Sequence, residues 1–373
     1  MSSLYIHIPF CNSKCLYCDF YSVIYDAAVA ADYVDVLCEQ IERLDKQYST
    51  IYIGGGTPTA LGGVLLGKLL NSLKRFAGCA TEFSLEANPE SLSREILRLF
   101  LGSGVNRLSL GVQSFNDNKL NNLGRIHSAQ AAQEAVHLAR SAGFENIGID
   151  LIFGVGNERL DGWRQELKKA AELPIRHISC YGLTYEKDTP LFNAVKKGAL
   201  VPLEDEAAAE MYRYAIGYLE KEGFKQYEVS NFAQEGYACR HNQNYWENNA
   251  YLGLGASAVS YLDGVRKENV SDIRAYIARH KREEDLGVFQ EKLPAIERAK
   301  ETAALKIRTE KGIDFSWFKQ KTGFDFPKLQ KSALAGLTER GLISYNRGSS
   351  QRPGVHLTQK GFLFADIVSS ELL

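Results

Sequence analysis

The chain has 373 residues, of which 45% are hydrophobic and 24% are charged, so it is long enough for two or three domains and a large apolar core. This composition excludes a mainly disordered protein. Lysine and arginine number 44 against 45 for aspartate and glutamate, and a net charge of -1 provides no overall positive field for nucleic acid. We therefore expect no nucleic-acid partner.

The N-terminal segment and the cysteine content indicate the compartment. No basic stretch followed by an apolar run comes before Cys11, so nothing marks the chain for export. The longest weakly polar stretch, 250–262, is well short of the roughly 20 residues that span a bilayer. Seven cysteines are too sparse for a disulfide scaffold in a chain of this length. We expect a cytoplasmic protein with free thiols.

Strand-like and helix-like segments alternate in the first two thirds of the chain. Six short apolar or β-branched runs predict buried strands, at 4–8, 50–53, 82–87, 107–112, 147–153 and 177–183. Between them, apolar residues at three and four spacing predict amphipathic helices, as at 33–44 and 132–139. This order predicts an α/β fold, a partial (β/α)6 TIM-like barrel with its site at the C-terminal strand ends.

The last third of the chain changes in character. A Gly, Asn and aromatic-rich stretch at 231–261 is expected to be irregular, and the mixed charges of 266–298 suggest surface helices. Further helices and a small hairpin suggest a winged-helix-like module with a structural or docking role; the segments are 299–307, 315–321, 328–340, 342–345 and 354–357. We divide the chain into a barrel, an irregular ligand-side segment with connecting helices, and a smaller α-rich C-terminal domain, with bounds 1–235, 236–298 and 299–373.

Cys11, Cys15 and Cys18 form a C-x3-C-x2-C run just after the first predicted strand. Three thiolates on one loop can bind three irons of a [4Fe-4S] cluster and leave the fourth iron open to a small molecule. A structural zinc site is an alternative, although it normally has four protein ligands, and three unrelated loop cysteines are another. The position of the run before a series of βα units favours the cluster.

This cysteine spacing resembles the radical S-adenosylmethionine (SAM) superfamily. The resemblance implies that the amino and carboxylate groups of SAM bind the open iron, and that an electron donor drives reductive cleavage to a 5′-deoxyadenosyl radical. It also implies that the triple glycine at 54–56 holds the methionine end of SAM, where the missing Cβ atoms allow close backbone approach.

Further segments narrow the resemblance to the branch that contains oxygen-independent coproporphyrinogen III oxidases and heme chaperones of the HemW type. These segments are 5–11, 54–59, 86–89, 111–115 and 123–125. The resemblance implies that the residues around one or two SAM sites are Tyr5, Tyr17, Gly55, Gly56, Thr57, Glu86, Gln113, Arg125 and Asp150. A carboxylate suits ammonium or ribose hydroxyl groups, and an arginine suits a carboxylate. Taken singly, each polar residue could equally be a surface ion pair or a helix cap.

Two features separate the oxidases from the chaperones. By resemblance, the oxidases carry a fourth cysteine two residues after the third, where this chain has Phe20. The segment 240–246 matches an H-N-x-x-Y-W signature typical of the chaperones. It implies His241 as an axial heme ligand, with Tyr245 and Trp246 stacked on the porphyrin. A lone histidine is more often structural, and His7 is a rival candidate that better suits a hydrogen bond beside the cluster.

Four cysteines lie outside this run. Cys38, Cys79 and Cys180 are expected to be inert packing residues. Cys239, two residues before His241, is a candidate for an extra ligand or a covalent heme attachment point, although a structural role is favoured.

The resemblance implies a heme chaperone that carries a [4Fe-4S] cluster and SAM, binds heme and transfers it to acceptor proteins, including respiratory and membrane-associated ones. The alternative is a coproporphyrinogen III oxidase, which decarboxylates two propionates, so enzymatic activity is left open. A purely structural metal-binding module is disfavoured by the polar residues at the strand ends. Whether the chain forms a homodimer is also left open.

Overall fold

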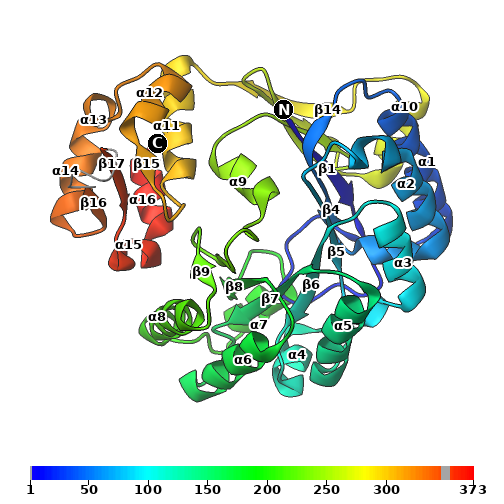
Figure 1. The fold of residues 1–373 in the computed structure, drawn as a ribbon, viewed down its shortest axis with the longest axis horizontal. Helices are drawn as coiled ribbons and strands as arrows, with labels where there is room; N and C mark the ends of the chain where they lie inside the picture. The colour runs from blue at the N-terminus through cyan, green and yellow to red at the C-terminus, as the bar shows by residue number, and fades with distance from the viewer. Residues whose placement is uncertain (1, 346–352) are drawn as a thin grey trace.

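The computed structural model describes residues 2–345 and 353–373, and its main feature is an open, curved sheet that forms a partial barrel (Figure 1). Seven neighbouring strands of this sheet run parallel. In spatial order they are β11 (Tyr251–Leu254), β1 (Ser2–Ile8), β4 (Tyr48–Gly55), β5 (Glu82–Ala87), β6 (Arg107–Gln113), β7 (Asn146–Phe153) and β8 (His177–Gly182). The α/β partial barrel predicted from the sequence is confirmed.

Antiparallel strands extend the sheet at both ends. Beyond β8 lie β10 (Asn231–Ala233) and β9 (Lys225–Gln226), and beyond β11 lie β12 (Val259–Leu262), β13 (Val265–Asn269) and β14 (Gly287–Lys292). A separate short pair, β2 (Phe10–Cys11) and β3 (Val23–Ile24), brackets the cysteine loop. Because β9 and β14 do not pair with each other, the barrel stays open on one side.

The helices that follow the parallel strands lie around the outside of the sheet (Figure 1). They are α1 (Ala27–Glu42), α2 (Gly62–Ala77), α3 (Arg94–Gly102), α4 (Asp117–Leu123), α5 (Ala129–Ala142), α6 (Leu160–Glu172), α7 (Pro190–Lys196) and α8 (Asp205–Lys221), with 3-10 turns η1 (Pro58–Leu61) and η2 (Pro89–Ser91). Several begin at a side-chain cap; for example, Asp26 accepts hydrogen bonds from the amides of Ala28 and Val29.

The two faces of β1 show how the sequence creates the inner and outer sides of the barrel. Leu4 and Ile6 belong to the apolar core between the sheet and the helices. Because side chains alternate along a strand, Ser3, Tyr5 and His7 share the opposite, inner face. The interior of this barrel is therefore lined by polar and aromatic side chains.

The C-terminal module has an apolar core of its own, which begins at Ala299. Its three-stranded sheet has the order β15 (Ile313–Asp314), β17 (Gly354–Leu357) and β16 (Ile343–Tyr345). Its helices are α11 (Ala295–Lys306), α12 (Phe315–Thr322), α13 (Phe326–Leu329), α14 (Lys331–Glu339), α15 (Gln359–Leu363) and α16 (Ala365–Glu371). The predicted hairpin and helices are present, although the helix expected at 328–340 is divided into α13 and α14.

The sequence-based description of 231–298 is wrong in part. The stretch 231–261, expected to be irregular, contains α9 (Arg240–Trp246), β10, β11 and nearly all of β12. The charged stretch forms β13, α10 (Ile273–Lys281) and β14. Pairing explains the difference, because β11 joins the parallel sheet beside β1 and the next three strands add to it. These strands have no clear apolar alternation; all five residues of β13 are half-buried.

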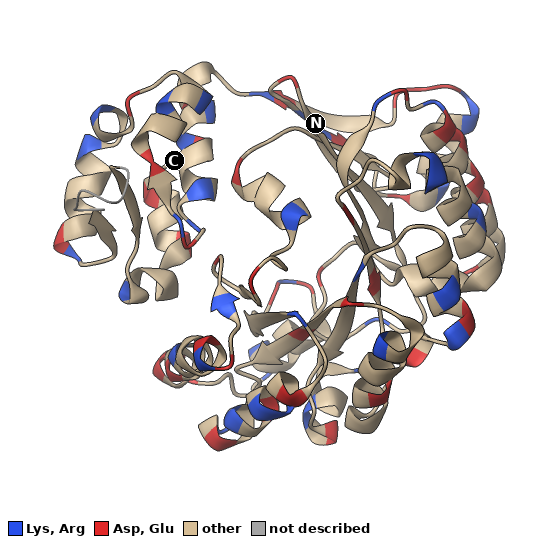
Figure 2. Cartoon of the chain, in the orientation of Figure 1, with Lys and Arg blue, Asp and Glu red and all other residues tan. Residues whose placement is uncertain are grey.

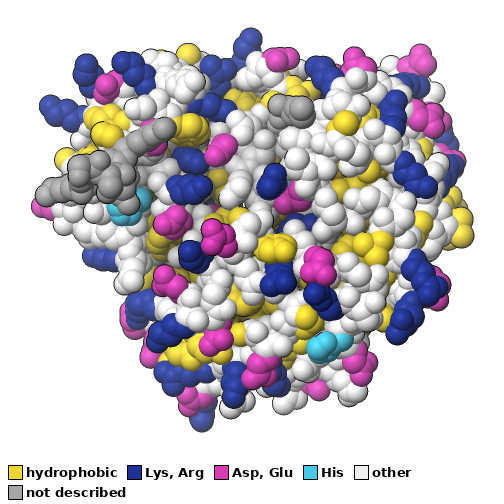
Figure 3. Space-filling model, in the orientation of Figure 1, with side chains coloured by type: hydrophobic (Ala, Val, Ile, Leu, Met, Phe, Trp, Pro, Cys, Tyr) yellow, Lys and Arg dark blue, Asp and Glu magenta, His cyan; other side chains and the backbone are white. Residues whose placement is uncertain are grey.

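Charges of both signs are spread over the outer helices of the barrel and over the C-terminal module (Figure 2). On the face shown in Figure 3, hydrophobic side chains form small scattered groups between these charges. In the described ranges, no helix combines the length and apolar character needed to cross a bilayer.

Candidate cofactor site at the cysteine loop

The three cysteines of the C-x3-C-x2-C run lie on a loop held at both ends by backbone contacts. Cys11 ends β2, where it pairs with Ile24 of β3. In the middle of the loop, Leu16 donates its amide to the carbonyl of Leu123 (3.0 Å) and accepts from the amide of Leu191 (3.0 Å). Cys11 is buried, and the two later cysteines are half-buried. The loop is thus fixed between the first strands, α4 and α7.

The surroundings of these thiols suit metal-bound thiolates. Burial raises the pKa of Cys11 and of Cys18, so both thiols favour their protonated form and metal binding would release protons. The hydrogen bond from Thr57 Oγ1 (3.7 Å) lowers the pKa of Cys11 against the effect of burial, and Arg125 Nη1 lies 3.3 Å from Cys15 Sγ. Hydrogen bonds and positive charge favour the deprotonated sulfur that iron requires.

In the described residues, no group of three or more histidine, cysteine, aspartate or glutamate side chains converges on a position for a single metal ion. In a [4Fe-4S] cluster each protein thiolate binds a different iron, so such a site does not need three sulfurs around one point.

The triple glycine ends β4 directly beneath the cysteine loop. Gly55 has a φ of +117°, and a Cβ there would lie 2.7 Å from the ring of His7. A Cβ on Gly56 would lie 2.7 Å from the carbonyl oxygen of Phe10 and 2.9 Å from Cys11 Sγ. Larger residues would therefore push the loop and the strand apart, which explains the need for glycine at these positions.

A cavity of about 420 Å³ opens beside the loop, at the C-terminal ends of the parallel strands. Its lining includes eleven of the predicted cluster and SAM residues: Cys11, Cys15, Tyr17, Cys18, Gly55, Gly56, Thr57, Glu86, Gln113, Arg125 and Asp150. This is the edge at which barrel proteins place their sites. The structure therefore brings together nearly the whole predicted set from six separate segments of the chain.

Four acidic residues line the cavity, and two of them, Glu86 and Asp150, come from the parallel strands. Glu86 accepts from the Tyr52 hydroxyl (2.6 Å) and from the amide of Gly55 (3.2 Å). Burial raises the pKa of Glu86 to about 7, although the bond from Tyr52 lowers it. Burial also raises the pKa of Asp150, against the effect of a hydrogen bond from Ser179. Half-buried carboxylates at a cavity wall suit an ammonium group or hydroxyl groups of a ligand.

Arg125 and Lys14 are the cations in the cavity lining, and Arg125 is the one held by hydrogen bonds to the barrel strands and loops. Its Nη2 donates to Asn88 Oδ1 (2.7 Å) and to the carbonyl of Gly111 (2.8 Å), and its Nη1 faces Cys15. Its Nε is buried and has no hydrogen-bond partner among the described residues. The unmatched donor and the nearby carboxylates fit a polar, zwitterionic ligand such as SAM.

Asn88 is a site residue that sequence reasoning did not single out. It lines the cavity and donates through Nδ2 to Thr57 Oγ1 (3.0 Å), while its oxygen accepts from Arg125. It thereby links the glycine loop to the arginine that faces Cys15. Its position directly after β5, within the 86–89 segment, was the signal that could have identified it.

Gln113 lies at an irregular end of β6. Its φ is +64°, and the pairing with β7 shifts register between Leu110 and Gln113. Backbone strain of this kind occurs often at binding sites, where the surrounding structure holds it. Here the irregularity places Gln113 in the cavity wall.

Tyr5 does not line the cavity. Its hydroxyl is 2.9 Å from His7 Nδ1, and its ring packs against Tyr52 and His241 with centroid distances of 6.2 and 6.5 Å. His7 in turn binds the carbonyl of Tyr21 through Nε2 (3.0 Å). Both side chains thus lie inside the barrel, beneath the cavity.

The residues of the H-N-x-x-Y-W signature lie on α9, inside the barrel and away from the cavity lining. His241 is only 1% exposed, with Nδ1 2.8 Å from Thr50 Oγ1 and Nε2 2.9 Å from the Tyr245 hydroxyl. Burial, and then the charge of Arg107, lower the pKa of His241 to about 3. Both ring nitrogens are engaged within the protein.

Glu82 of β5 anchors the start of α9. Its carboxylate accepts from the amides of Arg240 (2.8 Å) and His241 (3.1 Å), and from Cys239 Sγ (3.4 Å). Burial raises the pKa of Cys239 to about 12, which fits the structural role favoured for this cysteine. At the other end of α9, the guanidinium of Arg308 lies over the ring of Trp246, with Arg308 Cζ 5.5 Å from the ring centroid.

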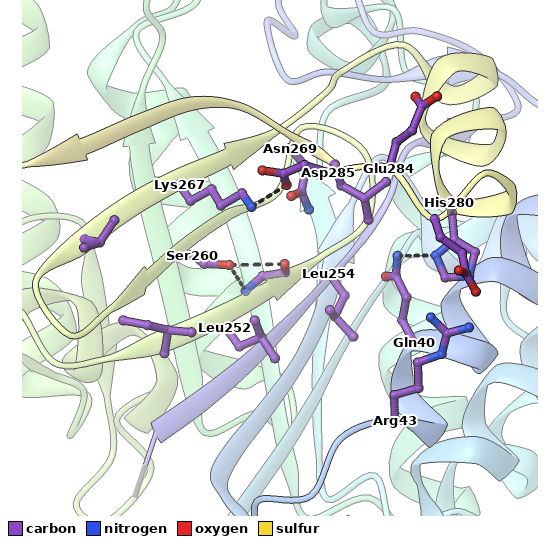
Figure 4. Close-up of a pocket in the computed structure, with 15 residues that line it drawn as sticks. Gln40, Arg43, Leu252, Leu254, Ser260, Lys267, Asn269, His280, Glu284 and Asp285 are labelled. Carbon is purple, nitrogen blue, oxygen red and sulfur yellow. Dashed lines mark hydrogen bonds and ion pairs between the residues drawn. The ribbon is translucent and has the colours of Figure 1, made fainter.

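A larger groove of about 750 Å³ lies on another part of the surface, between α1, α10 and the β11–β13 strands (Figure 4). Its polar side chains pair with one another: Gln40 with His280 (3.3 Å) and Lys267 with Asp285 (2.5 Å). None of the predicted site residues lines it. Size alone therefore does not identify the functional site of this protein.

Comparisons with known proteins identify the family of this chain. The radical SAM superfamily profile matches residues 5–170, and the HemN C-terminal domain profile matches residues 293–364. The chain is 35% identical to the heme chaperone HemW of Lactococcus lactis subsp. lactis, over 100% of this chain and 97% of that protein. It is 36% identical to HemW of Bacillus subtilis, over 100% and 99% of the two chains.

The structure of coproporphyrinogen III oxidase (HemN) from Escherichia coli, a radical SAM enzyme, superposes with a TM-score of 0.84. It covers 99% of this chain and 89% of that one at 23% identity, which supports the fold alone. The family assignment rests on the two HemW relatives, which align with the whole of this chain. The chain belongs to the HemW heme chaperone family of the radical SAM superfamily.

Proposed function

We propose that this protein binds heme and transfers it to acceptor proteins. The observation that carries the proposal is the similarity to curated heme chaperones over the whole chain. Phe20 supports the chaperone over the oxidase, because it stands where the resemblance implies a fourth cysteine for the oxidases, and it is 66% exposed.

We further propose that Cys11, Cys15 and Cys18 bind a [4Fe-4S] cluster and that SAM occupies the adjacent cavity. The wall residues with a proposed role toward SAM are Tyr17, Gly55, Gly56, Thr57, Glu86, Gln113, Arg125 and Asp150. When bound, the cluster would supply an electron to SAM. Arg125 would orient a carboxylate, and Glu86 would accept from an ammonium or hydroxyl group. Tyr5 would act from beneath the cavity.

The heme contacts of His241, Tyr245 and Trp246 stay a prediction. Against direct coordination, His241 is buried and both its ring nitrogens have partners. Coordination of heme iron by His241 Nε2 would require Tyr245 to release it. Movement of α9 would therefore have to accompany heme binding at this residue.

The partners in this proposal are heme, heme-accepting proteins that include respiratory and membrane-associated ones, and an electron donor for the cluster. We propose a cytoplasmic location, and we leave open whether the chain forms a homodimer. The division into 1–235, 236–298 and 299–373 is likewise a proposal. The separate apolar core from Ala299 onward supports its last boundary, while β11–β14 join the middle segment to the barrel sheet.

The test uses the full chain, purified and reconstituted with iron and sulfide under anaerobic conditions. One sample receives hemin, followed by a heme-free acceptor protein; a second receives coproporphyrinogen III, SAM and reductant. We expect hemin binding and transfer in the first sample and no decarboxylated product in the second. Efficient product formation would establish the oxidase instead, and failure to bind hemin would contradict the chaperone.

A further inference from the structure

His241 occupies a central position between the wall strands of the barrel. It is contributed by α9 but hydrogen-bonds to Thr50 of β4 (2.8 Å), while its amide donates to Glu82 of β5 (3.1 Å). Its ring packs between aromatic side chains, with centroid distances of 5.1 Å to Tyr52 and 5.0 Å to Tyr245. A close-packed buried ring restricts the positions of the side chains around it.

One series of contacts leads from His241 to the cavity. The His241 ring lies against the ring of Tyr52 at an interplanar angle of 33°. The Tyr52 hydroxyl donates to Glu86 Oε1 (2.6 Å), and Glu86 Oε2 accepts from the amide of Gly55 (3.2 Å). Glu86 and Gly55 both line the cavity, so only Tyr52 separates the histidine from Glu86, which in turn binds Gly55.

A second series of contacts reaches the cysteine loop. The ring of His241 lies 6.5 Å from that of Tyr5, whose hydroxyl is 2.9 Å from His7 Nδ1. His7 Nε2 binds the carbonyl of Tyr21, three residues after Cys18. The same histidine ring therefore supports both the glycine loop and the segment that follows the cysteines.

We propose that His241 is a positioning residue for SAM, which acts by holding Tyr52 against Glu86. The inference rests on the proposed SAM site, and it gives this residue a role that does not depend on heme. Without the ring, Tyr52 can turn into the vacated space, and Glu86 then loses its hydroxyl donor. A buried carboxylate without that donor is both less fixed in position and harder to ionise.

The test measures SAM affinity of the full-length protein with its reconstituted cluster, by calorimetry. We expect His241→Leu to weaken SAM binding about tenfold, which is the scale of one hydrogen bond to a charged group. Tyr52→Phe keeps its ring and loses only the hydroxyl, so it should weaken binding to a similar extent. His241→Phe keeps a ring against Tyr52 and should restore affinity to within about twofold of the wild type.

His177→Leu is the matched control. His177 is also 1% exposed inside the barrel, but its Nε2 bonds to Tyr227 and leads to neither Glu86 nor Gly55. The electron paramagnetic resonance spectrum of the reduced cluster supplies a second readout, because SAM bound at the open iron changes this spectrum. We expect that change to be smaller in His241→Leu and Tyr52→Phe than in the control, at equal SAM concentration.

Unchanged SAM affinity in His241→Leu would overturn the inference, and so would equal weakening in His177→Leu. Loss of hemin binding by His241→Leu with normal SAM binding would assign the residue to heme and also overturn it. If the wild type binds SAM and not hemin, the proposed chaperone function fails while the SAM comparison among variants still decides the inference. If the wild-type protein does not bind SAM, that result overturns the inference directly.

Discussion

The cavity beside the cysteine loop and the α9 helix were both expected to bind ligands, but the structure arranges them differently. The cavity has a volume of about 420 Å³ and a buried donor, Arg125 Nε, without a protein partner among the described residues. On α9, by contrast, His241 is closed within the barrel and both ring nitrogens are used. An unmatched donor facing a cavity suits a bound ligand, whereas the fully matched ring of His241 suits a structural support. At the end of α9, Trp246 Nε1 is buried without a partner among the described residues, so the contrast holds for His241 and not for the whole helix.

The largest expected effect concerns the cluster ligands. Cys15→Ala should remove the iron–sulfur cluster almost completely, because two thiolates cannot replace a missing third ligand. Cys79→Ala is the control, since Cys79 is exposed and far from the loop in sequence. Iron and sulfide content per chain after anaerobic reconstitution is the measurement. A normal cluster in Cys15→Ala would show that the loop is not the metal site.

Gly56→Ala tests the tight packing of the glycine loop. The added methyl would meet the Phe10 carbonyl and Cys11 Sγ at less than 3 Å, so we expect a loss of about 3 kcal/mol in the free energy of unfolding. Gly217→Ala, in the exposed part of α8 with open space around its Cβ position, should instead stabilise by about 0.5–1 kcal/mol. Urea unfolding of both variants measures the difference. Equal effects would contradict the close approach.

The buried state of His241 predicts an acid-sensitive contribution to stability. Burial and Arg107 lower its pKa to about 3, whereas the unfolded value is about 6.5, so protonation favours the unfolded chain. The stability from the neutral ring is complete above pH 6.5 and declines as the pH falls toward 3. Between pH 7 and pH 5 the wild type should lose about 2 kcal/mol more than His241→Phe, which cannot titrate. Urea unfolding at both pH values measures this difference.

A matching pH dependence in His241→Phe would mean that other groups carry the effect. It would also mean that the ring of His241 is more accessible than the contacts with Thr50 and Tyr245 imply. Such a result would reduce the contrast between α9 and the cavity.

Asn88→Ala should give the smallest change. It removes the hydrogen bonds to Thr57 and from Arg125, but the partners lie at the wall of an open cavity where water can replace the side chain. We expect a loss of about 1 kcal/mol in unfolding free energy, against no measurable change for the exposed Asn122→Ala. Thermal unfolding of the two variants side by side measures the effect. A loss as large as that of Gly56→Ala would make Asn88 a structural rather than a wall residue.

The strands and the cavity residues could be predicted from the sequence for the same reason. Central parallel strands are buried on both faces, so their apolar runs are visible in the sequence, and polar residues directly after them must meet at one edge. The strands that were missed lie at the border of the sheet. In β13, the residues Val265–Asn269 carry three charges and are half-buried. This segment is therefore a strand because it pairs with β12 and β14, and not because its apolar residues alternate.

By itself, the sequence determined the cysteine spacing, the glycine loop and the order of βα units, because each depends on neighbouring residues or on a short repeat. The tertiary structure alone decided the environment of His241. Its partner Thr50 is 191 positions away, and Glu82 is 159 positions away. Whether a histidine faces a ligand or closes a barrel depends on which distant strands surround it, and no local pattern encodes that choice.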